Sequence, residues 1–177
     1  MIDMREYGKA LFLITEEEGT TDKVLVDVRI AERIFKENPE YAKLLDSPAV
    51  PKDERISLAD KAFGSLDTNL LNLIKILTQK REVCHFDKVA VAYSALYDDS
   101  RGILRVEAVT AVPLTDSQRE AMTKRLSESL NKTVVLHNKV DRSILGGVTL
   151  RYSGVQLDGS VKTRLDKFEQ ALKQTLI

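Results

Sequence analysis

The chain lacks tryptophan and has a single cysteine, Cys84, so an internal disulfide cannot form. Its 27 lysines and arginines equal its 27 aspartates and glutamates, and this zero net charge argues against nucleic-acid binding by bulk charge. No apolar run reaches the roughly 20 residues that a membrane-spanning helix needs. The first residues have the pattern of neither a secretory signal nor a transit peptide. We therefore expect a cytoplasmic protein that does not insert into a membrane.

Motifs for nucleotide, metal and catalytic sites are also missing. The sequence contains no Walker lysine motif, no G-x-G-x-x-G, no H-E-x-x-H and no C-x-x-C pair. His85 is next to Cys84, but neighbouring helical residues point about 100° apart, which is unsuited to sharing a catalytic proton. Aromatic side chains that could stack on RNA bases are scarce. We expect no catalytic residues, no cofactor, no metal and no nucleic acid, and therefore a binding or structural role.

Composition and charge change near residue 100. Residues 1–105 carry 16 basic and 19 acidic side chains, whereas residues 106–177 carry 11 basic and 8 acidic ones. The apolar periodicity changes at the same place from helical to mixed. These shifts predict a boundary near 98–102, which gives two domains, 1–102 and 103–177.

Helical periodicity runs through the first domain. Tyr7, Ala10, Leu11 and Ile14 form one apolar stripe behind a predicted cap at Asp3. The fifth predicted helix is apolar on most sides between residues 70 and 77, so it is either the central helix of the bundle or a helix with a second face reserved for a partner. Six helices with short connections predict a bundle. They begin near Asp3, Thr21, Pro39, Pro51, Asp67 and Phe86.

The second domain has mixed periodicity. Alternation predicts strands over 103–112, 133–140 and 148–152, and Thr115 with Gln118 forms a capping box that opens a helix. Gly146-Gly147 lies between two strands and is typical of a tight turn. A last helix is predicted from Val161, Leu165, Phe168 and Leu172. The expected fold class is α+β: an N-terminal six-helix bundle followed by a small mixed β-α-β-β-α domain.

Two stretches of the sequence match the pattern of one known family. The first is Tyr7-Gly8-Lys9-Ala10-Leu11-Phe12 in the opening helix. The second and stronger is a signature with its structural turn in the second domain, on Val140, Asp141, Gly146, Gly147, Arg151, Asp158 and Ser160. With this ordered series the chain resembles the δ subunit family of F-type ATP synthases, which includes the mitochondrial oligomycin-sensitivity-conferring protein. It departs from the family at Gly8, where alanine is more usual, at Arg142, where proline is common, and at Ser153, where glycine is common.

The resemblance implies a non-catalytic stator subunit that resists rotor torque during proton- or sodium-driven ATP synthesis. Residues 1–102 would bind the N-terminal helices of the α subunits at the catalytic head. Residues 103–177 would bind the C-terminal ends of the b subunits of the peripheral stalk. One copy per complex is expected, peripheral to the cytoplasmic face of the cell membrane.

A helix-in-groove interface needs two adjacent helices with spare apolar surface, and the first and fifth predicted helices are the candidates. Ala10 is small enough to let a visiting backbone come close. The residues expected to contact the α-subunit helix are Tyr7, Ala10, Leu11, Ile14, Leu73, Ile76, Leu77 and Lys80. Two alternatives stay open: these residues are ordinary bundle core, or the chain is a generic helical adaptor for amphipathic partner helices.

Overall fold

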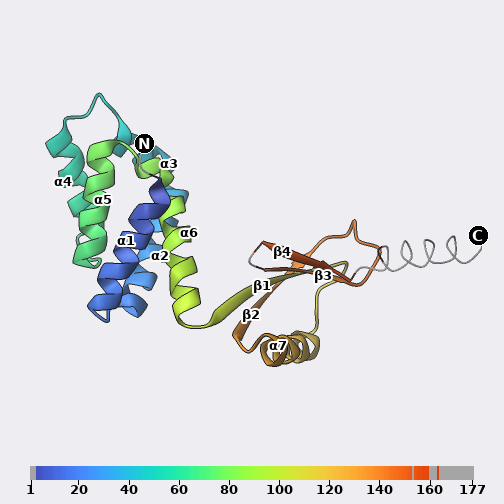
Figure 1. Ribbon diagram of the computed structural model, residues 1–177. Coiled ribbons are helices and arrows are strands. Elements are labelled where there is room, and N and C mark those ends of the chain that lie inside the picture. The colour runs from blue at the N-terminus through green and yellow to red at the C-terminus, as the bar shows by residue number, and fades with distance from the viewer. Residues whose placement is uncertain (1–2, 153, 160–162, 164–177) are drawn as a thin grey trace, which may run out of the picture. The chain divides into compact units, whose positions relative to one another are not determined.

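The computed structural model describes residues 3–152, 154–159 and 163 (Figure 1). The chain divides into two compact units, Met1–Ser100 and Arg101–Ile177. Helices fill the first unit and a mixed sheet with a helix fills the described part of the second, so the α+β class is confirmed. The assignment of a separate partner to each predicted domain stays a prediction. The expected last helix and Ser160 lie outside the described residues.

The first unit contains six α-helices and one short 3-10 helix within its described residues. The 3-10 helix corrects the predicted count of six. It forms because the Asp46 carboxylate accepts hydrogen bonds from the backbone N–H groups of Val83 and Cys84, both at 2.9 Å. The helices are α1 (Met4–Glu17), α2 (Thr21–Glu37), α3 (Pro39–Asp46), α4 (Lys52–Phe63), α5 (Thr68–Lys80), η1 (Val83–His85) and α6 (Phe86–Ser100).

Local sequence signals set the ends of the two helices that matter most below. Asp3 caps α1, as predicted, because its side chain accepts a hydrogen bond from Arg5 N at 3.0 Å. Asp67 caps α5 in the same way through Asn69 N at 2.9 Å. Arg81 ends α5 in the left-handed conformation, with φ at 60°.

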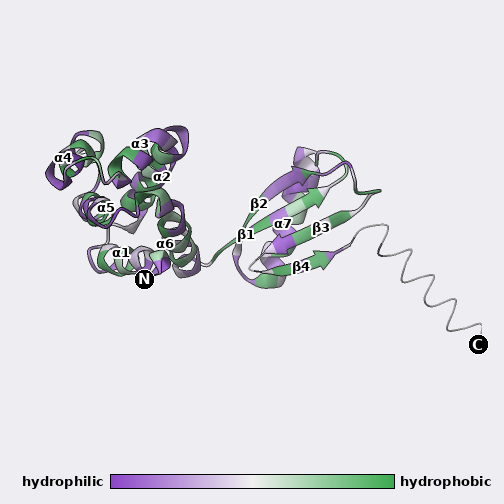
Figure 2. Cartoon of the chain, turned by 90° about the horizontal axis from the view of Figure 1, so that it is seen from above, coloured by the Kyte–Doolittle hydropathy of each residue, from purple (hydrophilic) through white to green (hydrophobic). Residues whose placement is uncertain are grey.

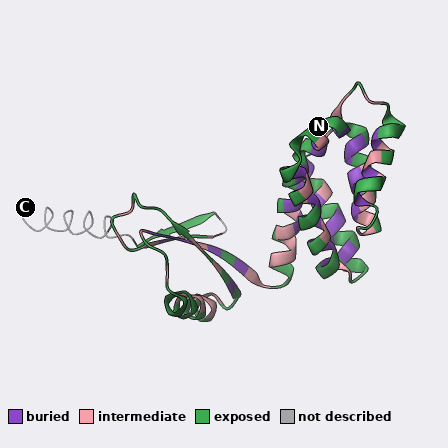
Figure 3. Cartoon of the chain, turned by 180° about the vertical axis from the view of Figure 1, so that it is seen from behind, coloured by how far each residue is buried: buried purple, intermediate pink, exposed green. Residues whose placement is uncertain are grey.

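The core of the first unit is aromatic and closely packed. Phe35 contacts both Phe63 and Phe86, with ring centroids 5.0 and 5.3 Å apart. Tyr93 is fully buried, and its hydroxyl oxygen lies 2.9 Å from Thr15 Oγ1. Each helix carries both apolar and polar residues (Figure 2), and the buried ones face inward (Figure 3). This pattern is that of amphipathic helices around one core.

A buried arginine links three helices of the bundle. Arg55 on α4 is only 3% exposed. Its Nη1 donates hydrogen bonds to the carbonyl of Leu45 in α3 at 2.8 Å and to that of Thr78 in α5 at 2.6 Å. Both carbonyls lie in the last turn of their helices, where backbone acceptors lack intrahelical partners and cations are favoured.

The second unit has a four-stranded sheet in the order β2-β1-β3-β4. Strands β1 and β2 are parallel, and the other neighbours are antiparallel. Helix α7 packs Leu126 and Leu130 on a core of Leu104, Val106 and Val134, although none of its own residues is fully buried (Figure 3). The elements are β1 (Ile103–Thr110), α7 (Asp116–Leu130), β2 (Thr133–Val140), β3 (Val148–Tyr152) and β4 (Val155–Asp158).

The fourth strand was not predicted. Gly154 has φ at 79°, which allows the chain to reverse after Tyr152 and to pair β4 with β3. All four residues of β4 are exposed, including Val155 and Leu157 at 45% and 50%. A short edge strand of this kind lacks the buried face that makes alternation detectable. The capping box of Thr115 and Gln118 is confirmed at the start of α7.

Candidate partner-binding groove

Helices α1 and α5 lie side by side in the first unit and run in opposite directions (Figure 1). At one end, Lys80 Nζ of α5 lies over the ring of Tyr7 of α1, 5.4 Å from its centroid. At the other end, Asn69 Nδ2 donates a hydrogen bond to Glu18 Oε2 at 2.8 Å. The span between Tyr7 and Glu18 is about 16 Å at the helical rise per residue, or about three turns.

Five of the eight predicted contact residues reach the surface on these two helices. Ile14 is 44% exposed and Ile76 is 43% exposed, which is high for such large apolar side chains. Ala10 and Lys80 are exposed, and Tyr7 is half-buried. Tyr7, Ala10 and Ile14 follow helical spacing on α1, and Ile76 and Lys80 do so on α5. These five residues give an exposed, largely apolar surface along α1 and α5 with a basic residue at one end, and this surface is the candidate groove.

The other three predicted residues belong to the bundle core. Leu11, Leu73 and Leu77 are 3%, 7% and 0% exposed. They lie beneath the groove and fix the two helices, so a partner resting on this surface would meet the exposed five first. Leu13 was missed by the sequence reasoning, although it is 58% exposed. Its position three residues after Ala10 was the available signal, because i and i+3 share a helix face.

The Tyr7–Lys80 end of the groove holds a polar group without a partner. Tyr7 Oη is buried, and no group among the described residues stands in hydrogen-bonding geometry to it. A polar interaction with this hydroxyl, and to a lesser degree the charge of Glu82, raises the pKa of Lys80. The ammonium therefore stays charged at neutral pH, although it does not complete a hydrogen bond to the phenol.

The signature residues of the second unit build turns and strand contacts. The Asp141 carboxylate accepts hydrogen bonds from Ser143 N at 2.9 Å and Ser143 Oγ at 2.7 Å, and these bonds lower the pKa of Asp141. Gly147 has φ at 87°, a conformation that favours glycine. Arg151 Nε donates to Gln156 Oε1 at 3.1 Å. Strand β2 ends at Val140, the connection from β2 to β3 contains Gly146, and β4 ends at Asp158. The Asp158 carboxylate accepts a hydrogen bond from Thr149 Oγ1 in the neighbouring strand β3.

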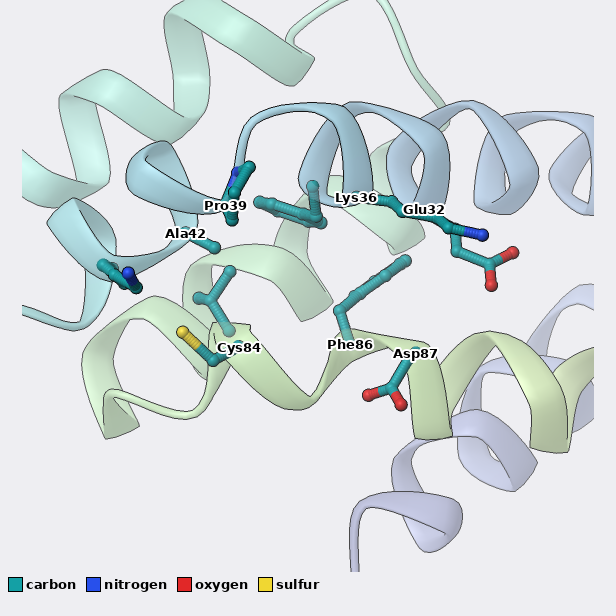
Figure 4. Close-up of a pocket in the computed structure, with 10 residues that line it drawn as sticks. Glu32, Lys36, Pro39, Ala42, Cys84, Phe86 and Asp87 are labelled. Carbon is teal, nitrogen blue, oxygen red and sulfur yellow. The ribbon is translucent and has the colours of Figure 1, made fainter.

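A separate pocket of about 430 Å³ lies between α2, α3, η1 and the start of α6 (Figure 4). Phe35, Ala42 and Phe86 line it, and the carboxylates of Glu32 and Asp87 lie at one end. It shares no residue with the groove. Cys84 is in its wall, where burial and then the hydrogen bond and charge of Asp46 raise the pKa of the thiol to about 11. Such a thiol is a poor nucleophile at neutral pH.

Metal clusters and membrane-spanning helices are both absent from the described residues. No group of three or more histidine, cysteine, aspartate or glutamate side chains there is placed to hold a metal ion. No helix in the same part of the chain is long and apolar enough to cross a membrane.

Comparison with known proteins decides the family. The family model of the ATP synthase delta (OSCP) subunit matches residues 4–172. The chain belongs to this family. ATP synthase subunit delta of Clostridioides difficile is 32% identical to it over 172 residues, which cover 96% of this chain and 95% of that one. The delta subunit of Anaeromyxobacter dehalogenans (strain 2CP-1) is 30% identical, with 96% of each chain covered.

A solved structure shares the fold. One chain of the Toxoplasma gondii mitochondrial ATP synthase hexamer superposes with a TM-score of 0.75 at 23% identity, over 97% of this chain and 98% of that one. Membership of the delta/OSCP family makes this chain a non-catalytic stator subunit of ATP synthase, as the resemblance implied.

Proposed function

We propose that this stator subunit joins the catalytic head of the ATP synthase to its peripheral stalk, with one copy per complex. Residues 1–102 bind N-terminal helices of the α subunits, and residues 103–177 bind the C-terminal ends of the b subunits. The protein is held at the cytoplasmic face of the cell membrane through the complex. The observation that supports the first contact is the exposed apolar surface along α1 and α5.

The groove has the features that a docked amphipathic helix requires. Exposed Ile14 on α1 and Ile76 on α5 supply apolar surface on both helices, and the small exposed Ala10 on α1 lets a backbone approach closely. The three buried leucines hold the walls at a fixed spacing, so little ordering cost remains for binding. A span of about 16 Å accommodates about eleven residues of a partner helix.

A stator contact must also release slowly, because it is loaded during every catalytic step. A nanomolar dissociation constant corresponds to about −12 kcal/mol, which a docked helix with several buried anchors can supply. We therefore expect affinity in this range between the full-length chain and the purified head, with a negative heat-capacity change from apolar burial.

Filling the groove tests the proposal. Ala10→Trp places a large ring where the partner backbone would lie and is expected to weaken head binding at least tenfold by calorimetry. Ala62→Trp, at an exposed position of α4, is the matched control and should bind as the wild type does. Circular dichroism establishes that both variants fold. Wild-type affinity in a folded Ala10→Trp variant would place the head contact elsewhere.

The same titration separates the stator role from a generic adaptor. A generic adaptor would bind unrelated amphipathic helices as tightly as it binds the head of its own organism.

The stalk contact is tested independently, by asking whether residues 103–177 within the full-length chain are protected from hydrogen exchange when a fragment from the C-terminal end of the b protein is added. Absence of protection at saturating fragment would contradict the assignment of that unit.

A further inference from the structure

The groove has one polar group whose hydrogen bond the described residues do not supply. Tyr7 Oη is buried and lacks a partner among them. Leaving such a group unpaired forfeits the hydrogen bond that it makes to water in the unfolded chain, so a native hydroxyl in this state is unusual. Tyr41 shows the ordinary arrangement, since its hydroxyl donates to the carbonyl of Leu58 at 3.0 Å.

A cation lies over the ring that carries this hydroxyl. Lys80 Nζ stands over the Tyr7 ring, 5.4 Å from its centroid, and forms no ion pair within the described part of the chain. Lys80 is exposed, so its long side chain can move aside when the groove is occupied. The opposite end differs, because there Glu18 already accepts a hydrogen bond from Asn69.

At the Tyr7–Lys80 end, the Lys80 ammonium is a donor, and the Tyr7 hydroxyl has an O–H to donate besides an oxygen that can accept. A phenol O–H and an ammonium are each best satisfied by a carboxylate, which accepts charge-assisted hydrogen bonds through two oxygens. We infer that the α-subunit helix in the groove carries an acidic side chain at this end, and that its carboxylate accepts hydrogen bonds from Tyr7 Oη and Lys80 Nζ. This inference rests on the proposed function. It identifies the chemistry of the partner and gives the docked helix a fixed register.

Two tyrosine variants give opposite expectations. Tyr7→Phe removes an unpaired hydroxyl, so the free full-length chain should unfold at an equal or higher temperature, while its affinity for the purified head falls about tenfold. Tyr41→Phe removes a hydroxyl that is bonded within the protein, so its thermal stability should fall while head affinity stays unchanged. A purely structural role for Tyr7 predicts no loss of affinity.

Lysine variants and the partner complete the test. Lys80→Met should weaken head binding about tenfold, and adding it to Tyr7→Phe should cost less than the product of the two effects, because both donate to one acceptor. Lys61→Met, at an exposed position of α4, is the charge control. Changing acidic residues in the N-terminal helix of the α protein singly to amides should reveal one whose loss no longer matters in the Lys80→Met background.

The outcomes separate this inference from the proposed function. If the wild-type chain does not bind the head, the proposed function fails. If Ala10→Trp abolishes binding but Tyr7→Phe binds as tightly as the wild type, the groove stands and the acidic partner is refuted. Equal weakening by Lys61→Met would also refute it, because the effect would then be one of overall charge.

Discussion

Gly8 lies where α1 and α6 are in close contact, and its replacement by alanine gives a quantitative test of the packing. A Cβ built at Gly8 lies 2.6 Å from the carbonyl oxygen of Val89, 2.8 Å from Ala92 Cβ and 3.1 Å from Tyr93 N. Two of these neighbours are backbone atoms of a helix, which cannot rotate away. Relief requires α1 and α6 to separate by several tenths of an ångström.

Two effects of opposite sign decide the magnitude. Alanine favours a helix interior over glycine by about 1 kcal/mol. Overpacking a close helix contact costs about 1–3 kcal/mol, with the upper part of the range expected where backbone atoms are struck. We therefore expect Gly8→Ala to destabilise the chain by about 1–2 kcal/mol, or about 2–8 °C in melting temperature at roughly 2–4 °C per kcal/mol.

The assay is thermal and urea unfolding of the full-length chain, followed by helical circular dichroism. Ala10→Gly, at an exposed position two residues further along α1, measures the helix-propensity effect alone and should cost about 1 kcal/mol. If propensity governed Gly8 as well, Gly8→Ala would stabilise by the same amount. A Gly8→Ala variant as stable as the wild type, or more stable, would refute the close α1–α6 contact.

Three further predictions address other parts of the chain. Arg55→Ala should destabilise the first unit by about 2–4 kcal/mol, since it leaves a cavity and removes the hydrogen bonds to two helix-end carbonyls, whereas Arg33→Ala at an exposed site should be nearly neutral in urea unfolding. Cys84, with a thiol pKa of about 11, should be alkylated at pH 8 at least tenfold more slowly in the folded chain than in the urea-unfolded one. Hydrogen bonds from Ser143 lower the pKa of Asp141, so the stabilisation by the Asp141 carboxylate should be present above about pH 4 and lost as the pH falls through the lowered pKa. Asp141→Asn should remove this component of the acid unfolding curve. An acid unfolding curve that the substitution leaves unchanged would contradict the prediction.

Apolar periodicity and helix-capping residues predicted a helix or strand well where one local sequence signal dominated. Asp3 begins α1 and Thr115 begins α7 as expected, because a single side chain satisfies the free backbone N–H groups there. The 3-10 helix η1 was missed because its cap, Asp46, lies 37 residues before Val83, and no local pattern reports such a contact. The edge strand β4 was missed because its apolar residues are exposed.

The candidate groove shows a different limit of sequence reasoning. An apolar stripe identifies residues that avoid water, but it does not say whether the bundle or a partner covers them. Leu77 and Ile76 are neighbours in a helix that is apolar on most sides, yet one is 0% and the other 43% exposed. The unpaired hydroxyl of Tyr7 is likewise invisible in the sequence, because hydrogen-bond partners are a property of the fold.

In the proposed role, a load that enters at the groove must leave α1 through its neighbours in the bundle. The first route is the Gly8 contact, where α1 lies close to backbone atoms of Val89 and Tyr93 and to the Cβ of Ala92 in α6. The second is Tyr93 of α6, whose hydroxyl lies 2.9 Å from Thr15 Oγ1 and also donates to the carbonyl of Thr21 at 3.2 Å. Both routes converge on α6, and only Arg101 and Gly102 separate α6 from β1. In the proposed role, load from α1 is therefore received by α6, the last helix of the first unit.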